Sequence, residues 1–418
     1  MSELPLRAQL ASVLGRSAAG LSRATGRGDG SVIGGRVALK VQPDLLGRLS
    51  RGRRLALVSA TNGKTTTTRL ISQALREFGA VATNEQGANM PTGHITALSA
   101  DKSAVNGVLE VDEKYLPQVI EATQPAFVVL MNLSRDQMDR ASEINLLAKK
   151  WRTALGKSNA HVIANADDPL VAWAGLGAPN ATWVSAGQRW KEDSWCCPEC
   201  GAHLKREADP YWECPECGLA RPQTSWTIDN DADTLVAPDG QCIKLQLNLP
   251  GDANRANAAI AAATAAGYGM HPERTIERLR EIKSVAGRYT SLVTMGVEVR
   301  LLLAKNPAGW LESFAVLDPP RVPVILGVNA QVPDGKDTSW LWDVDYRVLR
   351  DRRVFVTGER RTDLALRLET DGVPFEVADR VDEVLGRLKS ERPDTTKVDV
   401  IANYTAFQQI RTAYGRVQ

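Results

Sequence analysis

The stretch RRLALVSATNGKTTTTRLISQALREFG, residues 53–79, decides the fold of the first part of the chain. An apolar run is followed by a turn that contains Gly63 and then by a helical pattern. Such a unit points backbone N–H groups and the positive end of a helix dipole at a bound anion. Lys64 is placed to reach the β- and γ-phosphates of a nucleotide, and Thr65 to hold Mg²⁺. The stretch therefore predicts a phosphate-binding loop, although Val58 stands where the general pattern has its first glycine.

Three further apolar runs continue this pattern, at residues 106–113, 127–133 and 161–167. Helical patterns separate them, which predicts a parallel sheet with crossover helices. Glu110 and Asp112 come at the end of the first of these runs, where an α/β sheet presents its ligands. A metal carboxylate is the functional interpretation, and solvated acids at a strand end are the alternative.

A second α/β series begins at about Val297. We therefore expect an ATP-binding domain over residues 1–295 and a separate C-terminal α/β domain over residues 296–418. Neither an internal repeat nor a low-complexity linker interrupts the sequence.

The composition is that of an ordinary soluble protein, with 43% hydrophobic and 24% charged residues in 418. The net charge of +2 gives no reason to expect a polyanionic partner, nucleic acid included. No apolar run approaches the ~18 residues that a membrane-spanning helix needs. Residues 6–21 predict a short amphipathic helix that packs against the body of the protein, with a membrane surface as the alternative. These features predict a cytoplasmic protein.

The segment CCPECGAHLKREADPYWECPECG, residues 196–218, predicts a zinc ribbon inserted at about residues 190–225. Its two CPECG motifs offer four thiolates, from Cys197, Cys200, Cys214 and Cys217. A redox pair needs only one such motif, and iron–sulfur sites usually have other spacings. Four thiolates leave no open coordination position, so this Zn²⁺ is expected to be structural and not catalytic.

The phosphate loop ATNGKTTTT resembles the ATP loop of the Mur ligases and folylpolyglutamate synthases, with Ala60 in place of the family's first glycine. The resemblance implies ATP as cofactor together with Mg²⁺. It also implies a nucleotide-binding role for a run of six residues: Thr61, Asn62, Gly63, Lys64, Thr65 and Thr66.

Other segments resemble the same superfamily in the same order. LEVDE is similar to the strand whose glutamate coordinates Mg²⁺, which implies that role for Glu110. In NLSRDQMDR, Gln137 replaces the family's metal-binding histidine. GDANRANAAIAAA places Asn254 where the family meets adenine, with Ala253 in place of a histidine. GRYT implies that Arg288 reaches the phosphates.

The cysteine insertion, RDQMDR, KNPAGW (305–310) and DGKDTSWLWDVDY (334–346) resemble the MurT family, the Mur-ligase-like subunits of lipid II isoglutaminyl synthase. The resemblance implies a Mur-ligase-type central domain and a Rossmann-like C-terminal domain. It implies that ATP activates the α-carboxylate of D-glutamate in the peptidoglycan stem peptide as an acyl phosphate. Ammonia from a GatD-type glutaminase then gives D-isoglutamine. Lys305 and Asn306 are possible ligands in this scheme.

The chain shows no means of its own to release ammonia. A glutaminase usually needs a nucleophilic cysteine near a histidine, and Cys242 has no such context. A second subunit is therefore expected, and the resemblance implies a heterodimer in which an aspartate of this chain completes the partner's Cys–His pair. We assign that role to Asp337 ahead of Asp334. Trp340 and Trp342 are either interface anchors or core residues.

Two other functions are weighed against this one. A free-standing amino-acid ligase of the Mur or folylpolyglutamate type would turn over ATP without a partner. A non-catalytic nucleotide-binding scaffold would have little need of both Lys64 and Glu110. The leading prediction has lipid II or a related muropeptide as substrate and places the enzyme at least transiently at the inner face of the plasma membrane.

Overall fold

The computed structural model describes residues 5–24, 31–84, 87–101, 103–136, 143–284 and 289–415. The chain divides into two compact units. The first comprises Met1–Leu133 and Glu143–Lys283, and the second Ser134–Ser142 and Ser284–Gln418.

A nine-stranded sheet runs through the described part of the first unit, in the order β2-β3-β1-β4-β5-β6-β7-β8-β9. The strands are β1 (Arg54–Ser59), β2 (Val81–Thr83), β3 (Asn106–Glu110), β4 (Phe127–Leu130), β5 (His161–Asn165), β6 (Ala181–Ser185), β7 (Trp226–Asp229), β8 (Thr234–Val236) and β9 (Cys242–Lys244). The strands from β2 to β7 pair in parallel. β8 and β9 extend the sheet in antiparallel pairing, which makes it mixed.

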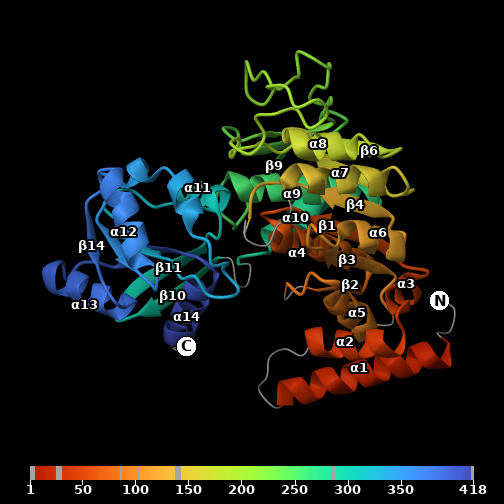
Figure 1. Cartoon of the computed structure of the whole chain (residues 1–418), viewed down its shortest axis with the longest axis horizontal. Helices are drawn as coiled ribbons and strands as arrows, with labels where there is room; N and C mark the ends of the chain where they lie inside the picture. The colour runs from red at the N-terminus through yellow and green to blue at the C-terminus, as the bar shows by residue number, and fades with distance from the viewer. Residues whose placement is uncertain are drawn as a thin grey trace. The chain divides into compact units, whose positions relative to one another are not determined.

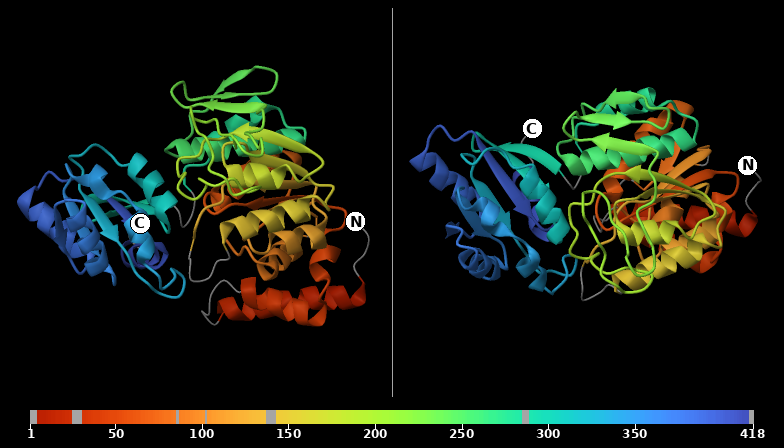
Figure 2. Two further views of the ribbon diagram at one scale, coloured as in Figure 1. Left: turned by 45° about the horizontal axis from the view of Figure 1, so that its top comes forward. Right: turned by 90° about the horizontal axis from the view of Figure 1, so that it is seen from above.

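Helices cover both faces of this sheet (Figures 1 and 2). One face carries α4 (Lys64–Leu75), α9 (Asp252–Gly267) and α10 (Pro272–Arg280). The other carries α3 (Leu45–Ser50), α5 (Pro91–Ala100), α6 (Leu116–Thr123), α7 (Ile144–Leu155) and α8 (Pro169–Gly175). Two N-terminal helices, α1 (Leu6–Ala24) and α2 (Ser31–Val41), pack on each other and on α5, and the 3-10 turn η1 (Arg76–Phe78) follows α4.

The central strand β1 explains why its sequence is apolar without alternation. Leu55 and Leu57 are fully buried in the core beneath α3, α5 and α6. Ala56 and Val58 are also fully buried, and they point to the opposite face because side chains alternate along a strand. A parallel strand covered on both faces is apolar at every position, and β1 ends at the loop that the sequence analysis singled out.

The second unit has its own six-stranded sheet, in the order β10-β11-β15-β12-β13-β14 among its described residues. Its strands are β10 (Tyr289–Thr294), β11 (Val297–Leu303), β12 (Val324–Gly327), β13 (Val354–Thr357), β14 (Phe375–Val377) and β15 (Lys397–Ala402). Its helices are α11 (Pro307–Ala315), α12 (Arg361–Thr370), α13 (Val381–Glu391) and α14 (Tyr404–Tyr414), with the 3-10 turns η2 (Ser339–Asp343) and η3 (Tyr346–Leu349). Separate apolar cores lie on the two faces of this sheet.

The boundary between the units differs from the expected position near residue 295. β10 pairs antiparallel with β11 from Tyr289–Leu302 to Thr294–Val297, so the whole hairpin belongs to the second sheet. The division therefore falls between Lys283 and Ser284. Apolar content alone did not reveal this, because β10 begins the second unit before its first strongly apolar strand.

None of the helices in the described ranges is both long and apolar enough to cross a bilayer.

Candidate functional site

The loop between β1 and α4 requires glycine at position 63. Gly63 has a φ of +86°, a conformation that residues with a Cβ rarely adopt. A Cβ there would also lie 2.7 Å from Asn257 Oδ1 and 2.8 Å from Met131 Cε. Gly63 thus lets α9 and the end of β4 close around the loop, and it directly precedes the N-terminus of α4, where the positive end of the helix dipole favours an anion.

Asn132, just beyond β4, fixes the loop backbone. Its side-chain Oδ1 accepts from Asn62 N at 2.8 Å, and its Nδ2 donates to Asn62 O at 3.0 Å. Its main-chain oxygen accepts from Thr61 N at 3.0 Å. These three hydrogen bonds hold the loop in one conformation before any ligand is bound, which lowers the entropy cost of binding.

Lys64 is the cation of the loop, and only 3% of its surface is exposed. Its Nζ donates to the carbonyl oxygens of Ala60 and Thr61 and lies 3.1 Å from Glu113 Oε1. A buried ammonium needs such partners to remain charged. A fixed positive charge beside a helix N-terminus is the electrostatic arrangement that binds a polyphosphate.

Thr65 and Glu110 form the oxygen-rich part of the site. The Thr65 hydroxyl donates to Glu110 Oε2 at 2.8 Å, and both residues are buried. Asn84 holds the Glu110 backbone through two reciprocal hydrogen bonds of 2.8 Å each. A hydroxyl and a carboxylate at this position are hard oxygen ligands of the kind that Mg²⁺ prefers.

His94 on α5 contacts the backbone of Glu110. Its Nε2 lies 2.8 Å from the Glu110 carbonyl oxygen. Burial lowers the pKa of His94 to about 4, because the apolar surroundings disfavour the charged ring. A neutral ring therefore donates to this carbonyl at physiological pH.

The remaining nucleotide-site expectations have different outcomes. Thr66 is buried in the first turn of α4. Asn254 lies one turn from Asn257 on α9, is half-buried, and donates from Nδ2 to Pro250 O at 2.6 Å. Arg288 lies outside the described residues, as does Gln137. The structure thus brings together the loop, Glu110 and the start of α9.

Sequence reasoning did not assign five polar residues of this site: Asn84, His94, Glu113, Asn132 and Asn257. Two signals were available. Asn84 directly follows β2 and Asn132 closely follows β4, at the carboxyl ends of two parallel strands of one sheet, where ligands gather. Glu113 and Asn257 each lie three residues beyond a residue that was assigned, Glu110 and Asn254.

The four expected cysteines form one cluster. Their sulfur atoms all lie within 4.8 Å of one another, with Cys197 Sγ 3.6 Å from Cys217 Sγ and Cys200 Sγ 3.4 Å from Cys214 Sγ. A tetrahedron with Zn–S bonds of ~2.3 Å has edges of about 3.8 Å. The observed separations fit that geometry and the donor set fits Zn²⁺.

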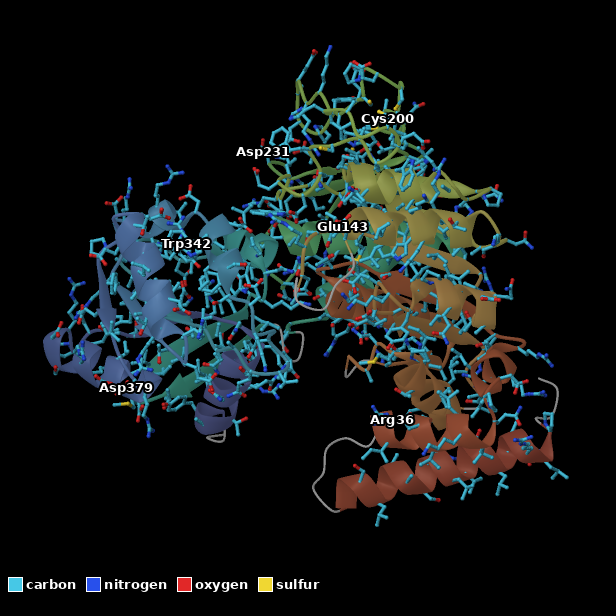
Figure 3. All side chains as sticks on the ribbon, viewed as in Figure 1. Arg36, Glu143, Cys200, Asp231, Trp342 and Asp379 are labelled. Atoms are coloured by element: carbon cyan, nitrogen blue, oxygen red, sulfur yellow. The ribbon has the colours of Figure 1, made fainter. Side chains whose placement is uncertain are left out.

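Each half of the cluster is a tight turn. Gly201 N donates to Cys197 O at 2.8 Å, and Gly218 N donates to Cys214 O at 3.0 Å. Both glycines have positive φ, +81° and +75°, and a Cβ on either would meet no atom within 4 Å. Figure 3 shows Cys200 in the insertion that leaves the sheet between β6 and β7.

The insertion packs on α8 and the loop before it, and Cys197, Leu204, Trp212 and Cys214 form an apolar cluster with Ala172 of α8. Trp212 is buried and donates from Nε1 to Ala166 O at 3.0 Å. Trp173 Nε1 donates to Glu199 Oε2 at 2.6 Å. Arg221 forms a buried ion pair with Asp167 at 2.7 Å. These contacts connect the cluster to the nucleotide-binding sheet without reaching Lys64 or Glu110.

The two candidate aspartates of the second unit differ sharply. Asp334 is buried and accepts hydrogen bonds from Thr405 N at 2.9 Å and from the Thr405 hydroxyl, which ties its loop to the start of α14. Asp337 is exposed and accepts from Ser339 N at 2.8 Å. That hydrogen bond lowers the pKa of Asp337, so its carboxylate is ionised at neutral pH. Asp334 therefore has a structural explanation, and Asp337 presents its carboxylate to solvent.

The neighbouring tryptophans do not share one face. Trp340 is half-buried 6.1 Å from the Trp310 ring, within the core of the unit. Trp342 is 54% exposed and labelled in Figure 3, with the Arg367 guanidinium 5.4 Å from its ring. Both lie in the 3-10 turn η2, where residues two apart point to different sides of the helix axis. Of the other possible ligands, Lys305 pairs with Asp136 at 2.6 Å and Asn306 caps α11.

Comparison with known proteins gives matches along most of the chain. Residues 58–265 match the Mur ligase middle domain, and residues 303–407 match the MurT ligase C-terminal domain. The lipid II isoglutaminyl synthase (glutamine-hydrolyzing) subunit MurT of Streptococcus pneumoniae is 31% identical, with 97% of this chain and 96% of that protein covered. The corresponding MurT subunit of Staphylococcus aureus is 30% identical, with 83% and 84% covered.

Among solved structures, the MurF ligase of Thermotoga maritima in complex with ADP superposes with a TM-score of 0.64 at 16% identity. The superposition covers 90% of this chain and 83% of the other. At this identity the likeness establishes the fold, which is a Mur-ligase-like α/β fold with mixed sheets.

Proposed function

The chain belongs to the MurT family, and from that membership we propose that it is the ATP-dependent synthetase subunit of a lipid II isoglutaminyl synthase. It amidates the α-carboxylate of D-glutamate in the peptidoglycan stem peptide to D-isoglutamine, through an acyl phosphate. The observation that carries the proposal is the identity of 31% along 97% of the chain to a MurT subunit, combined with an assembled phosphate loop.

The residues of the first unit fit an ATP–Mg²⁺ complex. When bound, ATP supplies the phosphoryl group that activates the substrate carboxylate. Gly63 allows close backbone approach, Lys64 places a positive charge beside the phosphates, and Thr65 with Glu110 offers oxygen ligands to the metal. Such preorganised charges stabilise a transferring phosphoryl group without having to reorient. Asn254 at the adenine and Arg288 at the phosphates complete this proposal by family resemblance.

Ammonia comes from a GatD-type glutaminase in a heterodimer with this chain. None of the four clustered cysteines is available as its nucleophile if they hold Zn²⁺. Asp337 fits the role of completing the partner's Cys–His pair, because its carboxylate is exposed while that of Asp334 is occupied within its own unit. An aspartate against the histidine Nδ1–H fixes the tautomer that the cysteine needs.

The cysteine cluster is proposed to hold one structural Zn²⁺ in a ribbon-like insertion. Four sulfurs leave no coordination position for water or substrate. The cluster is built from its own two turns and contains no residue of the phosphate loop. The remaining parts of the proposal are a Mur-ligase-type central domain, a Rossmann-like C-terminal domain, and action at the inner face of the plasma membrane. The parallel order of β11, β15, β12, β13 and β14 supports the C-terminal assignment.

The test is a mass-spectrometric assay of lipid II with ATP and Mg²⁺. The expected product is about one dalton lighter, since an –NH₂ group replaces –OH. It should form with glutamine only when the glutaminase is present, and with ammonium when this chain is alone. Asp337→Asn should abolish the glutamine-driven reaction and leave the ammonium-driven reaction unchanged.

An ATP-dependent addition of an amino acid by this chain alone would overturn the proposal and restore the free-standing ligase. Equal loss of both reactions in Asp337→Asn would remove Asp337 from the partner's catalytic group. Glu359→Gln, at another exposed acid of the same unit, is the matched control and should leave both reactions unchanged.

A further inference from the structure

Helix α1 buries its small residues and exposes its large apolar residues, the reverse of an ordinary surface helix. Its buried side consists of small residues, namely Ala8, Ala11, Ser12, Gly15, Ala19 and Ser22. Its large apolar residues lie on the exposed side, with exposed fractions of 85% for Leu6, 55% for Leu10 and 67% for Leu21. Val13 and Leu14 are exposed as well. The sequence analysis expected an amphipathic helix packed on the protein, and the helix does pack, but through its small side.

The reason for this inversion is a close crossing of α1 and α2. A Cβ on Gly15 would lie 2.8 Å from Gly34 O, and a Cβ on Gly34 would lie 2.6 Å from Gly15 O. Small residues on both helices let the backbones approach this closely. Figures 1 and 3 show the two helices side by side, with Arg36 labelled on α2. The orientation of α1 is therefore fixed by its packing, and the apolar stripe is left uncovered within the first unit.

The apolar stripe has basic borders. With about 100° of rotation per residue, Leu6, Leu10, Val13, Leu14 and Leu21 share one side of α1. Arg7 and Arg16, both exposed, lie on its two flanks. Neither α1 nor α2 contains an acidic residue, and α2 adds the exposed Arg36 and Lys40.

The basic charge is concentrated at this end of the sequence. Residues 1–54 contain ten Lys or Arg against three Asp or Glu, a net charge of +7. The rest of the chain has 41 Lys or Arg against 46 Asp or Glu, a net charge of −5. A polyanionic surface would attract the N-terminal part and repel the remainder, which orients the molecule on approach.

We propose that the exposed face of α1, formed by Leu6, Leu10, Val13, Leu14 and Leu21 with Arg7 and Arg16, docks on the surface of an anionic lipid bilayer. Leucine side chains enter the boundary between headgroups and acyl chains, and the flanking arginines stay at the phosphate level. A second copy of the chain fits less well, because it would bring one set of arginines against another. Use of a lipid-linked substrate by the same chain rests on the proposed function, but the docking face is inferred from α1 itself.

The experiment is co-sedimentation of the full chain with vesicles of phosphatidylcholine alone or of an equal mixture with phosphatidylglycerol. We expect binding to the anionic vesicles only, weakened by added salt because exposed charges are screened. The double variant Leu10→Gln/Leu21→Gln should bind at least about tenfold more weakly, since two apolar side chains no longer enter the bilayer. Val348→Gln/Leu366→Gln replaces two similarly exposed residues of the second unit and should bind like the parent chain.

Absence of binding to anionic vesicles overturns the proposal, as does unchanged binding of Leu10→Gln/Leu21→Gln. The parent chain could instead form a dimer and bind no vesicles. If Leu10→Gln/Leu21→Gln then dissociates this dimer, the exposed face of α1 is an interface with a second copy. Ammonium-driven amidation of a soluble, nucleotide-linked muropeptide separates the two proposals. Vesicle binding could weaken in Leu10→Gln/Leu21→Gln as expected while no amidation occurs with any muropeptide. The docking face is then supported and the proposed function is wrong.

Discussion

The phosphate loop and the cysteine cluster are both tight turns that contain a glycine of positive φ, yet they are held in different ways. The phosphate loop is fixed by residues distant in sequence, among them Glu110, Asn132 and Asn257. The cysteine cluster is formed by side chains that all lie within residues 197–217. A site built from distant segments depends on the whole fold, whereas a local cluster of thiolates would depend on the Zn²⁺ that we propose for it. Four predictions test this difference.

The largest effect is expected from removing one thiolate of the cluster. Cys214→Ser should abolish stoichiometric zinc binding, because one of the four thiolates, which is buried, is lost. Inductively coupled plasma mass spectrometry measures the zinc content. Metal coordination contributes on the order of 10 kcal/mol to the folding of small zinc domains. We expect the insertion to become sensitive to proteases while nucleotide binding at the loop persists. Cys242→Ser, at an exposed cysteine outside the cluster, should retain full zinc content. Loss of nucleotide binding in Cys214→Ser would contradict the independence of the two regions.

The next effect concerns the charge of the phosphate loop. Lys64→Met keeps a long side chain but removes the ammonium that pairs with Glu113. Ammonium-driven amidation should fall by about 10²- to 10³-fold, the loss typical of one electrostatic contact to a transition state. Zinc content should not change. Lys157→Met, at an exposed lysine of the same unit, is the control, and equal losses in both variants would deny Lys64 a specific role.

The third prediction is a pH dependence that only the distant-contact site should show. The pKa of His94 is about 4 in the folded protein, against 6.5 for an ordinary histidine. Since the unfolded chain binds the proton more tightly, the stability that the neutral ring provides is complete above pH 6.5. It is lost progressively as the pH falls from 6.5 to 4, by up to about 3 kcal/mol.

Urea unfolding between pH 7.5 and pH 4.5 measures this effect. His94→Gln should flatten the profile, and His203→Gln, at an exposed histidine of the insertion, should leave it unchanged. A His94→Gln profile as steep as that of the parent chain would show that other groups cause the acid sensitivity.

The sequence predicts the parts of both sites that are local. The order Gly63-Lys64-Thr65 and the two CPECG motifs each carry their chemistry within a few residues, so spacing, and for the loop the family resemblance, leads to a prediction without knowledge of the fold. Asn132 and His94 could not be assigned in this way, because their position depends on the neighbours of β1 in the sheet, which the sequence does not specify. Two features of the fold depend on such contacts as well. The pairing of β10 with β11 and the Gly15–Gly34 crossing of α1 and α2 are both contacts between separate segments, which the sequence analysis did not address.

The smallest effect, and the most direct comparison, comes from one substitution made in both regions. Gly201→Ala should cost about 1 kcal/mol, because φ is +81° but the added Cβ meets no atom within 4 Å. Gly63→Ala carries the same conformational cost at +86° and adds contacts of 2.7 Å to Asn257 Oδ1 and 2.8 Å to Met131 Cε. We expect about 2–3 kcal/mol for it, because α9 or the loop must shift.

Calorimetric titration with ATP separates the two glycine variants further. Gly63→Ala should weaken nucleotide binding, because the added methyl group displaces the backbone that approaches the phosphates, and Gly201→Ala should not. In a Met131→Ala background, Gly63→Ala should cost less stability than in the parent chain, because one of the two close contacts is absent, but the cost of the positive φ remains. If both glycine variants lose the same stability and the same affinity, the phosphate loop is no more dependent on distant segments than the cysteine cluster. The contrast between a site fixed by the whole fold and a site fixed by residues close in sequence would then have no basis.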